Sequence, residues 1–375
     1  MKHFRRFGRN ANLALFILLL ILWNVSYSIA ADSVDTDTKA RGRNIPSFLP
    51  FVIYTPETRW GGGIGGIYTF HIGESGPESR PSSFSLSTKY TQNEQYSIDL
   101  TPRLYLKEDK YYLESNILYQ KFPLKFYGIG NSNSDDKEED YTPKEIKVWV
   151  SLRRNIYERL RFGIQYNVEH TNIDEVEEGG LLDRGDILGY DGSKSSGVGL
   201  LVDWDSRDRV FSATKGAFYQ ASVTVYRDAL GSDFDFTRYI LDLRRYYSIL
   251  PAHSLALNGY FDFSSGEMPF QKLALLGGRF RMRGYYEGQH RDKNMMTFQI
   301  EYRIVPVWWR GGVVGFLGVG DVSDKVSNFQ LKDFKAAGGI GFRFQFNRGE
   351  GVNLRADFAF GRDTSGYYLT IQEAF

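Results

Sequence analysis

Leu160-Arg161-Phe162-Gly163-Ile164-Gln165-Tyr166-Asn167-Val168-Glu169 alternates in polarity from one side chain to the next. Leu, Phe, Ile, Tyr and Val fall on one side, and Arg, Gln, Asn and Glu fall on the other. Successive side chains of a β-strand point to opposite faces, so a period of two indicates a strand. An amphipathic helix would repeat its apolar residues at spacings of about three and four. The stretch predicts a strand with one apolar and one charged face.

The same alternation recurs from about Pro50 to the C-terminus in about sixteen segments. They start near residues 50, 61, 82, 95, 110, 144, 159, 196, 216, 235, 254, 294, 311, 336, 350 and 366. This leaves about 21 residues for each strand and its turn, and a tilted membrane strand needs about ten. An even number of antiparallel strands can close without an exposed edge. The expected fold is all-β, a transmembrane antiparallel β-barrel of about 16 strands.

The charges on the polar face favour a membrane barrel over a soluble sandwich. That face carries both signs within single strands, as in the pairs Glu301/Arg303 and Arg355/Asp357, while the other face is rich in Phe, Tyr, Leu and Ile. A polar lumen and a lipid-facing apolar band with aromatic girdles produce this pattern. Short connections also alternate with long ones such as 171–195 and 264–293. That asymmetry is typical of an outer-membrane barrel with short periplasmic turns and long outer loops.

The N-terminus reads as an export signal. A basic head with Lys2, Arg5, Arg6 and Arg9 precedes the apolar run 13–23, and Ile29-Ala30-Ala31 offers small residues for cleavage. The run is too short to span a bilayer, although an N-terminal anchor is the alternative. We expect a signal peptide at 1–31, a short periplasmic lead-in at 32–49 and the barrel at 50–375. Loss of the signal changes the formal charge from +1 to −3. The expected location is the bacterial outer membrane.

Composition argues against several other functions. The chain has no cysteine, which excludes disulfides, thiolate metal sites and a cysteine nucleophile. Its five histidines lie far apart, and no phosphate loop, Gly-x-Ser-x-Gly motif or zinc spacing is present. A net charge near zero gives no basic field for nucleic acid. We therefore expect no catalytic residues, no metal, no cofactor and no enzymatic activity.

One long connection carries a recognisable motif, Gly277-Gly278-Arg279-Phe280-Arg281-Met282-Arg283-Gly284-Tyr285-Tyr286-Glu287-Gly288. It resembles the hallmark loop of the BamA/TamA (bacterial surface antigen) family of outer-membrane barrels. Further segments resemble the same family in the same order, among them 126–131, 205–208, 298–303, 315–321, 340–343 and 354–357. The resemblance covers most of residues 50–375, and five strands follow the loop, as they do in the family. The chain looks like a barrel-only member without POTRA domains.

The resemblance implies that this loop folds back into the lumen. Its tip would be Arg283, Gly284 and Tyr285, and a buried guanidinium there would need paired acceptors on the inner wall. The wall residues expected around Arg283 are Glu301, Arg303, Phe316, Gly318 and Asp357. One departure concerns Gly318, where family members usually carry an acidic residue. Asp321 lies three positions further on, which leaves the wall partner of Arg283 open.

The family resemblance also implies a function in protein assembly, insertion or translocation, with outer-membrane lipid and client outer-membrane proteins as partners. A lateral seam between the first and last strands would admit the client. Pro50 and Pro56 flank the short strand 51–55 and lack ladder donors, and the glycine-rich run 61–66 offers few side chains for packing. The alternative is that these glycines simply allow sharp curvature of the barrel. Phe375 would complete a C-terminal barrel signal on the last strand. The alternatives are a passive pore and a barrel that anchors a partner protein. The oligomeric state is not predicted.

Overall fold

The computed structural model describes residues 45–55, 59–72, 80–133, 138–349 and 351–375. The expected signal peptide, the lead-in up to residue 44 and Pro56 lie outside these ranges. Sixteen strands form the wall: β1 (Ile45–Thr55), β2 (Arg59–Phe70), β3 (Ser82–Thr91), β4 (Tyr96–Leu106), β5 (Tyr111–Lys121), β7 (Glu139–Tyr157), β8 (Leu160–Val176), β9 (Gly192–Asp205), β10 (Gly216–Tyr226), β11 (Phe236–Leu250), β12 (His253–Gly266), β15 (Asn294–Trp308), β16 (Gly311–Ser323), β17 (Lys335–Asn347), β18 (Val352–Gly361) and β19 (Thr364–Ile371).

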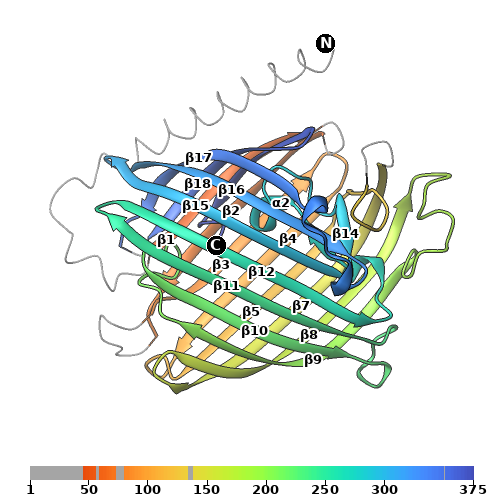
Figure 1. Cartoon of the computed structure of the whole chain (residues 1–375), viewed down its shortest axis with the longest axis horizontal. Coiled ribbons are helices and arrows are strands. Elements are labelled where there is room, and N and C mark those ends of the chain that lie inside the picture. The colour runs from red at the N-terminus through yellow and green to blue at the C-terminus, as the bar shows by residue number, and fades with distance from the viewer. Residues whose placement is uncertain (1–44, 56–58, 73–79, 134–137, 350) are drawn as a thin grey trace, which may run out of the picture. The chain divides into compact units, whose positions relative to one another are not determined.

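The expected all-β barrel with sixteen strands is confirmed. No wall strand starts more than five residues from its expected position. The largest differences are at β1, which begins at Ile45 within the expected lead-in, and at β7, which begins at Glu139. Figure 1 shows the strands lying side by side at a common tilt around an interior. In the described part of the chain, no helix is long and apolar enough to cross a bilayer.

Each wall strand pairs antiparallel with the next one along the wall, from β1 through to β19. The registers are long; β7 and β8, for example, stay paired from Tyr141↔Val176 to Tyr157↔Leu160. The three-residue strand β6 (Leu124–Phe126) pairs with β7 at its outer end. Within the described residues, no ladder joins β19 back to β1.

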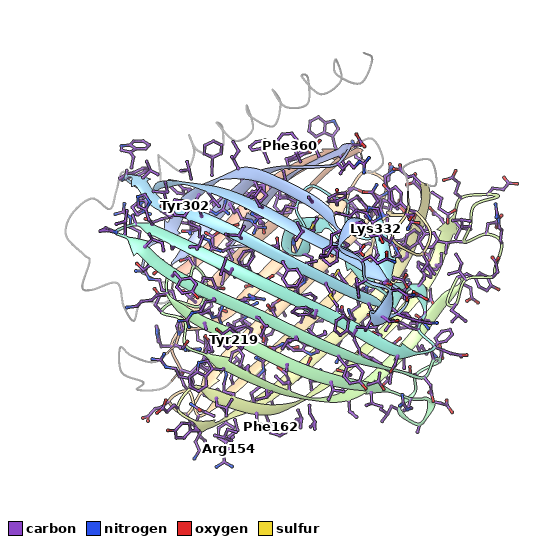
Figure 2. All side chains as sticks on the ribbon, in the orientation of Figure 1. Arg154, Phe162, Tyr219, Tyr302, Lys332 and Phe360 are labelled. Carbon is purple, nitrogen blue, oxygen red and sulfur yellow. The ribbon has the colours of Figure 1, made fainter. Side chains whose placement is uncertain are left out.

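Burial is inverted relative to a soluble protein, which is what a membrane barrel requires. Charged side chains on the wall strands are buried, such as Arg153, Arg355 and Glu301, each at most 1% exposed. Large apolar side chains on the alternate positions are exposed. Figure 2 shows two of them, Phe162 and Phe360, at the outer side of the wall. The polar face therefore lines the lumen, and the apolar face is the one that lipid covers.

The connections differ between the two ends of the barrel. One end carries tight turns, such as those after β4, β7, β11 and β15, together with the C-terminus. The other end carries the long loops, which contain the short elements η2 (Asp228–Leu230), η3 (Phe270–Lys272), β13 (Ala274–Leu276), α2 (Gly278–Arg281), β14 (His290–Asp292), η4 (Val326–Asn328) and η5 (Leu331–Asp333). The sequence pattern did not reveal these elements, because none is long enough to display a period.

Two connections fold into the barrel from opposite ends. From the long-loop end, the connection 267–293 packs Leu276, Met282 and Tyr285 against the lumen wall. From the short-turn end, the connection 206–215 between β9 and β10 is longer than its neighbours and turns inward. Its Phe211 lies in a buried cluster with Ile67 of β2 and Val352 of β18. The lumen is therefore filled from both sides.

Candidate functional site in the barrel lumen

The loop Gly277–Gly288 reverses direction inside the lumen through glycines. Gly277, Gly278 and Gly284 all have positive φ, at 114°, 76° and 109°, which side chains with a Cβ rarely adopt. The short helix α2 carries the chain inward, and β13 and β14 pair with one another to close the base of the loop. This geometry brings the loop tip to the wall formed by β15, β16 and β18.

Arg283 lies at the tip and is 2% exposed. Its Nη1 is 2.5 Å from Asp357 Oδ2 on β18, and its Nη2 is 2.6 Å from Glu301 Oε2 on β15. The guanidinium also stacks on Phe316 of β16, 3.5 Å from the ring centroid. Two carboxylates and an aromatic face therefore surround the buried cation, which offsets its desolvation.

Each of the two carboxylates has a second arginine. Glu301 Oε1 accepts from Arg303 Nε at 2.6 Å, and Asp357 Oδ1 accepts from Arg343 Nη1 at 2.6 Å. Removal of Arg283 would therefore leave neither carboxylate unpaired. The wall can hold its charges together without the loop, whereas Arg283 depends on the wall for its acceptors. Such an asymmetry suits a loop that docks and undocks.

The rest of the tip packs closely on the hairpin of β18 and β19. The Gly284 N–H donates to the Tyr368 hydroxyl at 3.0 Å, and a Cβ on Gly284 would lie 3.0 Å from the backbone of Phe360. The Tyr285 hydroxyl donates to the Ala336 carbonyl at 3.2 Å and accepts from the Arg362 N–H at 3.1 Å. Glycine at 284 therefore allows both the turn and the close approach.

The remaining expected wall residues lie around this centre. Gly318 faces the loop, since a Cβ there would lie 3.7 Å from Met282 Sδ. Asp321, the residue considered as a replacement for the missing acid, makes no ion pair with Arg283 among the described residues, and its Oδ1 has no hydrogen-bond partner there. The acceptors of Arg283 come from β15 and β18 instead.

The C-terminus differs from its expected place. The last strand ends at Ile371, and Gln372, with a φ of 76°, turns the tail into the lumen. Phe375 is buried beside Tyr246 and Ala213, and its backbone oxygen accepts from Arg303 Nη2 at 3.0 Å. Phe375 therefore does not continue the lipid-facing side of β19. Alternation ends at Ile371, because Glu373 stands where the period of β19 would place another apolar, lipid-facing side chain, and this break marks the turn.

Several residues of this centre were not singled out from the sequence as partners. Arg343 bonds both Asp357 and Glu373, at 2.6 and 2.7 Å, and Asn353 also donates to Glu373 at 2.8 Å. Period two places Arg343, Asn353 and Asp357 on the lumen face, but it cannot say which of them meet. Glu373 reaches them only because the tail turns inward at Gln372. No group of three or more His, Cys, Asp or Glu side chains that could hold a metal occurs among the described residues.

Comparisons with known proteins agree with this architecture. The sequence profile of the Omp85 superfamily domain matches residues 80–373. Among solved structures, BamA from Haemophilus ducreyi lacking POTRA domains 1-3 is similar, with a TM-score of 0.54, 16% identity, and 88% of this chain and 69% of that chain covered. CdiB from Acinetobacter baumannii has a TM-score of 0.56 and 13% identity, and the match covers 88% of this chain but only 59% of CdiB. These identities show a shared fold alone. No curated protein matches the chain.

Proposed function

The chain belongs to the Omp85 superfamily of outer-membrane barrels, and from this premise we propose that it inserts or translocates polypeptide clients. The superfamily consists of transport and assembly barrels and not of enzymes. In the proposed mechanism, the loop Gly277–Gly288 plugs the lumen at rest, and the wall opens sideways between β1 and β19 when a client engages. Client outer-membrane proteins are the proposed partners, in addition to the lipid around the barrel.

The observation that carries this proposal is the docking of Arg283 between Glu301 and Asp357. An outer loop of a passive pore has no need to bury a guanidinium in the lumen, where desolvation costs several kcal/mol unless acceptors are supplied. Here the acceptors are supplied, and each keeps a second arginine when the loop leaves. The arrangement supports a plug that can be released.

Weak pairing at the ends of the sheet supports the seam. Within the described residues no ladder joins β19 to β1. Pro50, inside β1, has no N–H to donate to a partner strand. β1 pairs with β2 along its whole length, from Ile45↔Thr69 to Thr55↔Arg59, so the place where the wall can part at low cost lies between β1 and β19.

Two measurements test the function. Depletion of the protein should lower the amounts of particular outer-membrane or exported proteins in a quantitative proteome. Cysteine pairs scanned around Ile53 and Ile371 should include one that cross-links the seam, and that disulfide should block client assembly until it is reduced. Single cysteines at the same positions serve as controls. If the locked barrel supports its clients as well as the reduced one, lateral opening is not the mechanism.

Conductance separates this function from a passive pore. In planar bilayers the unmodified barrel should give small and irregular openings, whereas Arg283→Ala should give larger ones. Arg362→Ala removes an exposed arginine, 89% accessible at the side chain, and should change nothing. A large and steady conductance in the unmodified protein would support the pore instead.

We further propose that residues 1–31 are removed on export and that 32–44 lead into the barrel. N-terminal sequencing of the protein purified from outer membranes tests this. The expected first residue lies close to Asp32, and an N-terminus at Met1 would indicate an anchor instead.

A further inference from the structure

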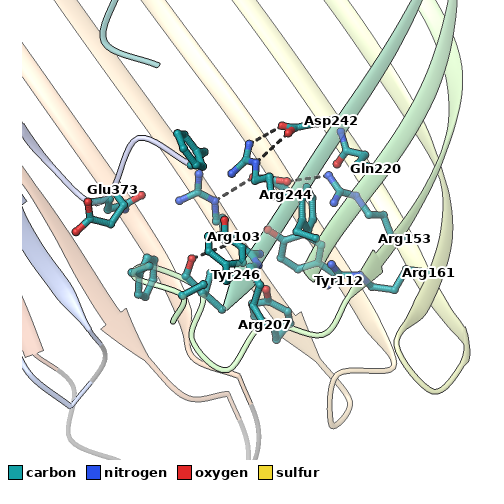
Figure 3. Close-up of a pocket in the computed structure, with 18 of the residues that line it drawn as sticks. Arg103, Tyr112, Arg153, Arg161, Arg207, Gln220, Asp242, Arg244, Tyr246 and Glu373 are labelled. Atoms are coloured by element: carbon teal, nitrogen blue, oxygen red, sulfur yellow. Dashed lines mark hydrogen bonds and ion pairs between the residues drawn. The ribbon is translucent and has the colours of Figure 1, made fainter. Parts of the chain in front are cut away.

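A cavity of 270 Å³ remains in the lumen between the two inward connections (Figure 3). Arg281 of α2 borders it from the long-loop side. Arg207 and Phe211 of the connection 206–215 and Phe375 of the tail border it from the short-turn side. The cavity therefore lies where the loop, the turn and the C-terminus approach one another.

The side chains around this cavity are mainly cationic. Six arginines line it: Arg103, Arg153, Arg161, Arg207, Arg244 and Arg281. They come from four wall strands, the connection 206–215 and α2. Figure 3 shows the labelled ones converging on a common space from different parts of the wall. A solvated lumen with random pairing would place acids among them in similar number.

The carboxylates that bond these arginines are fewer. Glu114 forms ion pairs with Arg103 and Arg153, at 2.9 and 2.8 Å. Asp203 forms an ion pair with Arg161 at 2.6 Å, and Asp205 forms one with Arg207 at 2.9 Å. Asp242 serves Arg244 at 2.5 Å and lies 3.9 Å from Arg281.

Six guanidinium groups thus share four carboxylates within ion-pair distance. Glu373 also lines the cavity, but its Oε2 accepts from Arg343 at 2.7 Å, outside the group. Asp205 additionally binds Arg80, which does not line the cavity. By these ion pairs the six lining arginines exceed their carboxylates by two positive charges, which a buried site must balance with an anion or with water.

Two buried polar atoms of the lining residues have no hydrogen-bond partner among the described residues; one can donate or accept, and the other can only donate. They are the hydroxyl of Tyr246 and Nε of Arg153, on side chains that are 2% and 1% exposed. Buried donors without acceptors are uncommon in folded proteins and indicate a missing ligand or water. An anion could accept from both groups, in agreement with the charge imbalance.

Aromatic rings hold the guanidinium groups in fixed orientations. Arg161 and Arg153 lie over the Tyr112 ring, 4.6 and 4.9 Å from its centroid. Arg207 and Arg244 lie over Phe218 at 4.7 and 5.3 Å. Rings that cover the faces of the guanidinium groups leave their N–H edges for hydrogen bonds, so little ordering would accompany ligand binding.

We propose that this cavity binds a small, doubly charged oxyanion of the phosphate or sulfate class. Two negative charges match the excess of two, and tetrahedral oxygens suit several N–H donors at once. The bound ion would bridge Arg281 of the connection 267–293 to Arg207 of the connection 206–215, and so hold the two inward connections together. A free ion is the occupant, because the two inward connections enclose the cavity away from lipid.

Calorimetric titration of the full chain in non-ionic detergent and chloride-free buffer tests the site. Sodium sulfate and inorganic phosphate should each bind with a stoichiometry near one, at least about tenfold tighter than nitrate, whose single charge leaves one positive charge unbalanced. Short-chain phosphatidic acid, which carries phosphate on a lipid, should not displace sulfate. Equal affinities for sulfate and nitrate, no saturable heat, or displacement by the lipid would overturn the proposal.

Variants separate the site from general charge effects. Arg281→Gln removes the most loosely paired arginine, so it should weaken sulfate at least about tenfold and abolish the preference over nitrate. Arg281→Lys keeps the charge and should retain that preference. Tyr246→Phe removes only the unpartnered hydroxyl and should weaken sulfate several-fold without loss of folding. Arg245→Gln, on the opposite face of β11, makes the same change in net charge and should bind like the unmodified chain. Unchanged sulfate binding in both Arg281→Gln and Tyr246→Phe would refute the assignment.

Discussion

Arg283 and Glu373 do not touch, yet a chain of three buried ion pairs joins them. Arg283 bonds Asp357 at 2.5 Å, Asp357 bonds Arg343 at 2.6 Å, and Arg343 bonds Glu373 at 2.7 Å. The first residue lies at the tip of the inward loop, and the last lies on the tail that follows β19. The loop and the tail after the last strand therefore share one electrostatic network. A substitution at one end should change the strength of the ion pairs at the other.

A double-mutant cycle measures that connection. Arg283→Ala and Glu373→Gln should each destabilise the barrel, and their effects should differ from additivity by about 0.5–3 kcal/mol, because both act on the Asp357–Arg343 pair. Urea unfolding in lipid vesicles gives the four free energies. The control cycle pairs Arg283→Ala with Arg362→Ala, which should add within about 0.5 kcal/mol. Additivity in the first cycle would mean that loop and tail are independent.

Gly284 should be far less tolerant than a glycine on the lipid side. Gly284→Ala forces a Cβ into a backbone with φ of 109° and against Phe360, at a cost of about 1–3 kcal/mol for the docked loop. The expected result is faster trypsin cleavage after Arg281 and Arg283. Gly315→Ala is the matched control, since a Cβ at 315 meets nothing within 4 Å. Equal cleavage of both variants would show that the tip does not depend on glycine.

The wall was predictable from the sequence because the alternation within each strand shows which side chains share a face. Glu301 and Asp357 could be placed on the lumen side from alternation alone, since a slip of one residue would bury Ile300 or Phe358 there instead. The pairs across the lumen were not predictable. That Arg303 meets Phe375 depends on the tilt of the wall and on the tail turning at Gln372. The tilt leaves no periodic signal, and the turn leaves only the break in alternation at Glu373.

The inward connection 206–215 was missed for a related reason. It has no alternation and reads as an ordinary turn, although Phe211 in the middle of a polar stretch was an available hint. Its burial with Ile67 and Val352 comes from strands distant in sequence. Long-range contacts of this kind require the closed sheet before they can form.

Phe211→Ala should therefore open the short-turn end only in part. Loss of a buried phenylalanine costs about 3–5 kcal/mol of local packing, but the loop held by Arg283, the proposed plug, stays in place. The single variant should conduct little more than the unmodified barrel, while Phe211→Ala combined with Arg283→Ala should give a large and steady conductance in planar bilayers. Leu331→Ala, which truncates a side chain that is 91% exposed, serves as the control. A large conductance in Phe211→Ala alone would mean that the loop is not a plug.

Acid should loosen the loop through His290 of β14. Burial, with help from the charge of Lys335, lowers the pKa of His290 to about 4, although a hydrogen bond to the Asn131 backbone opposes this effect; the Tyr285 ring also lies 5.8 Å away. Between about pH 6.5 and about pH 4 the unfolded chain binds a proton that the folded chain excludes, so stability falls as the pH is lowered through this window.

The loss attributable to His290 should approach about 3 kcal/mol at the acid end, because a tenfold change in proton affinity corresponds to about 1.4 kcal/mol. Other groups titrate in the same range, so the quantity to compare is the free energy of unfolding of the unmodified chain and of His290→Gln at both ends of the window. The variant should lose less on acidification, by about that amount. Lys335→Gln removes the nearby positive charge, and it should shrink the effect without abolishing it, because burial remains. Parallel curves for the unmodified chain and His290→Gln would exclude this histidine as the acid-sensitive group.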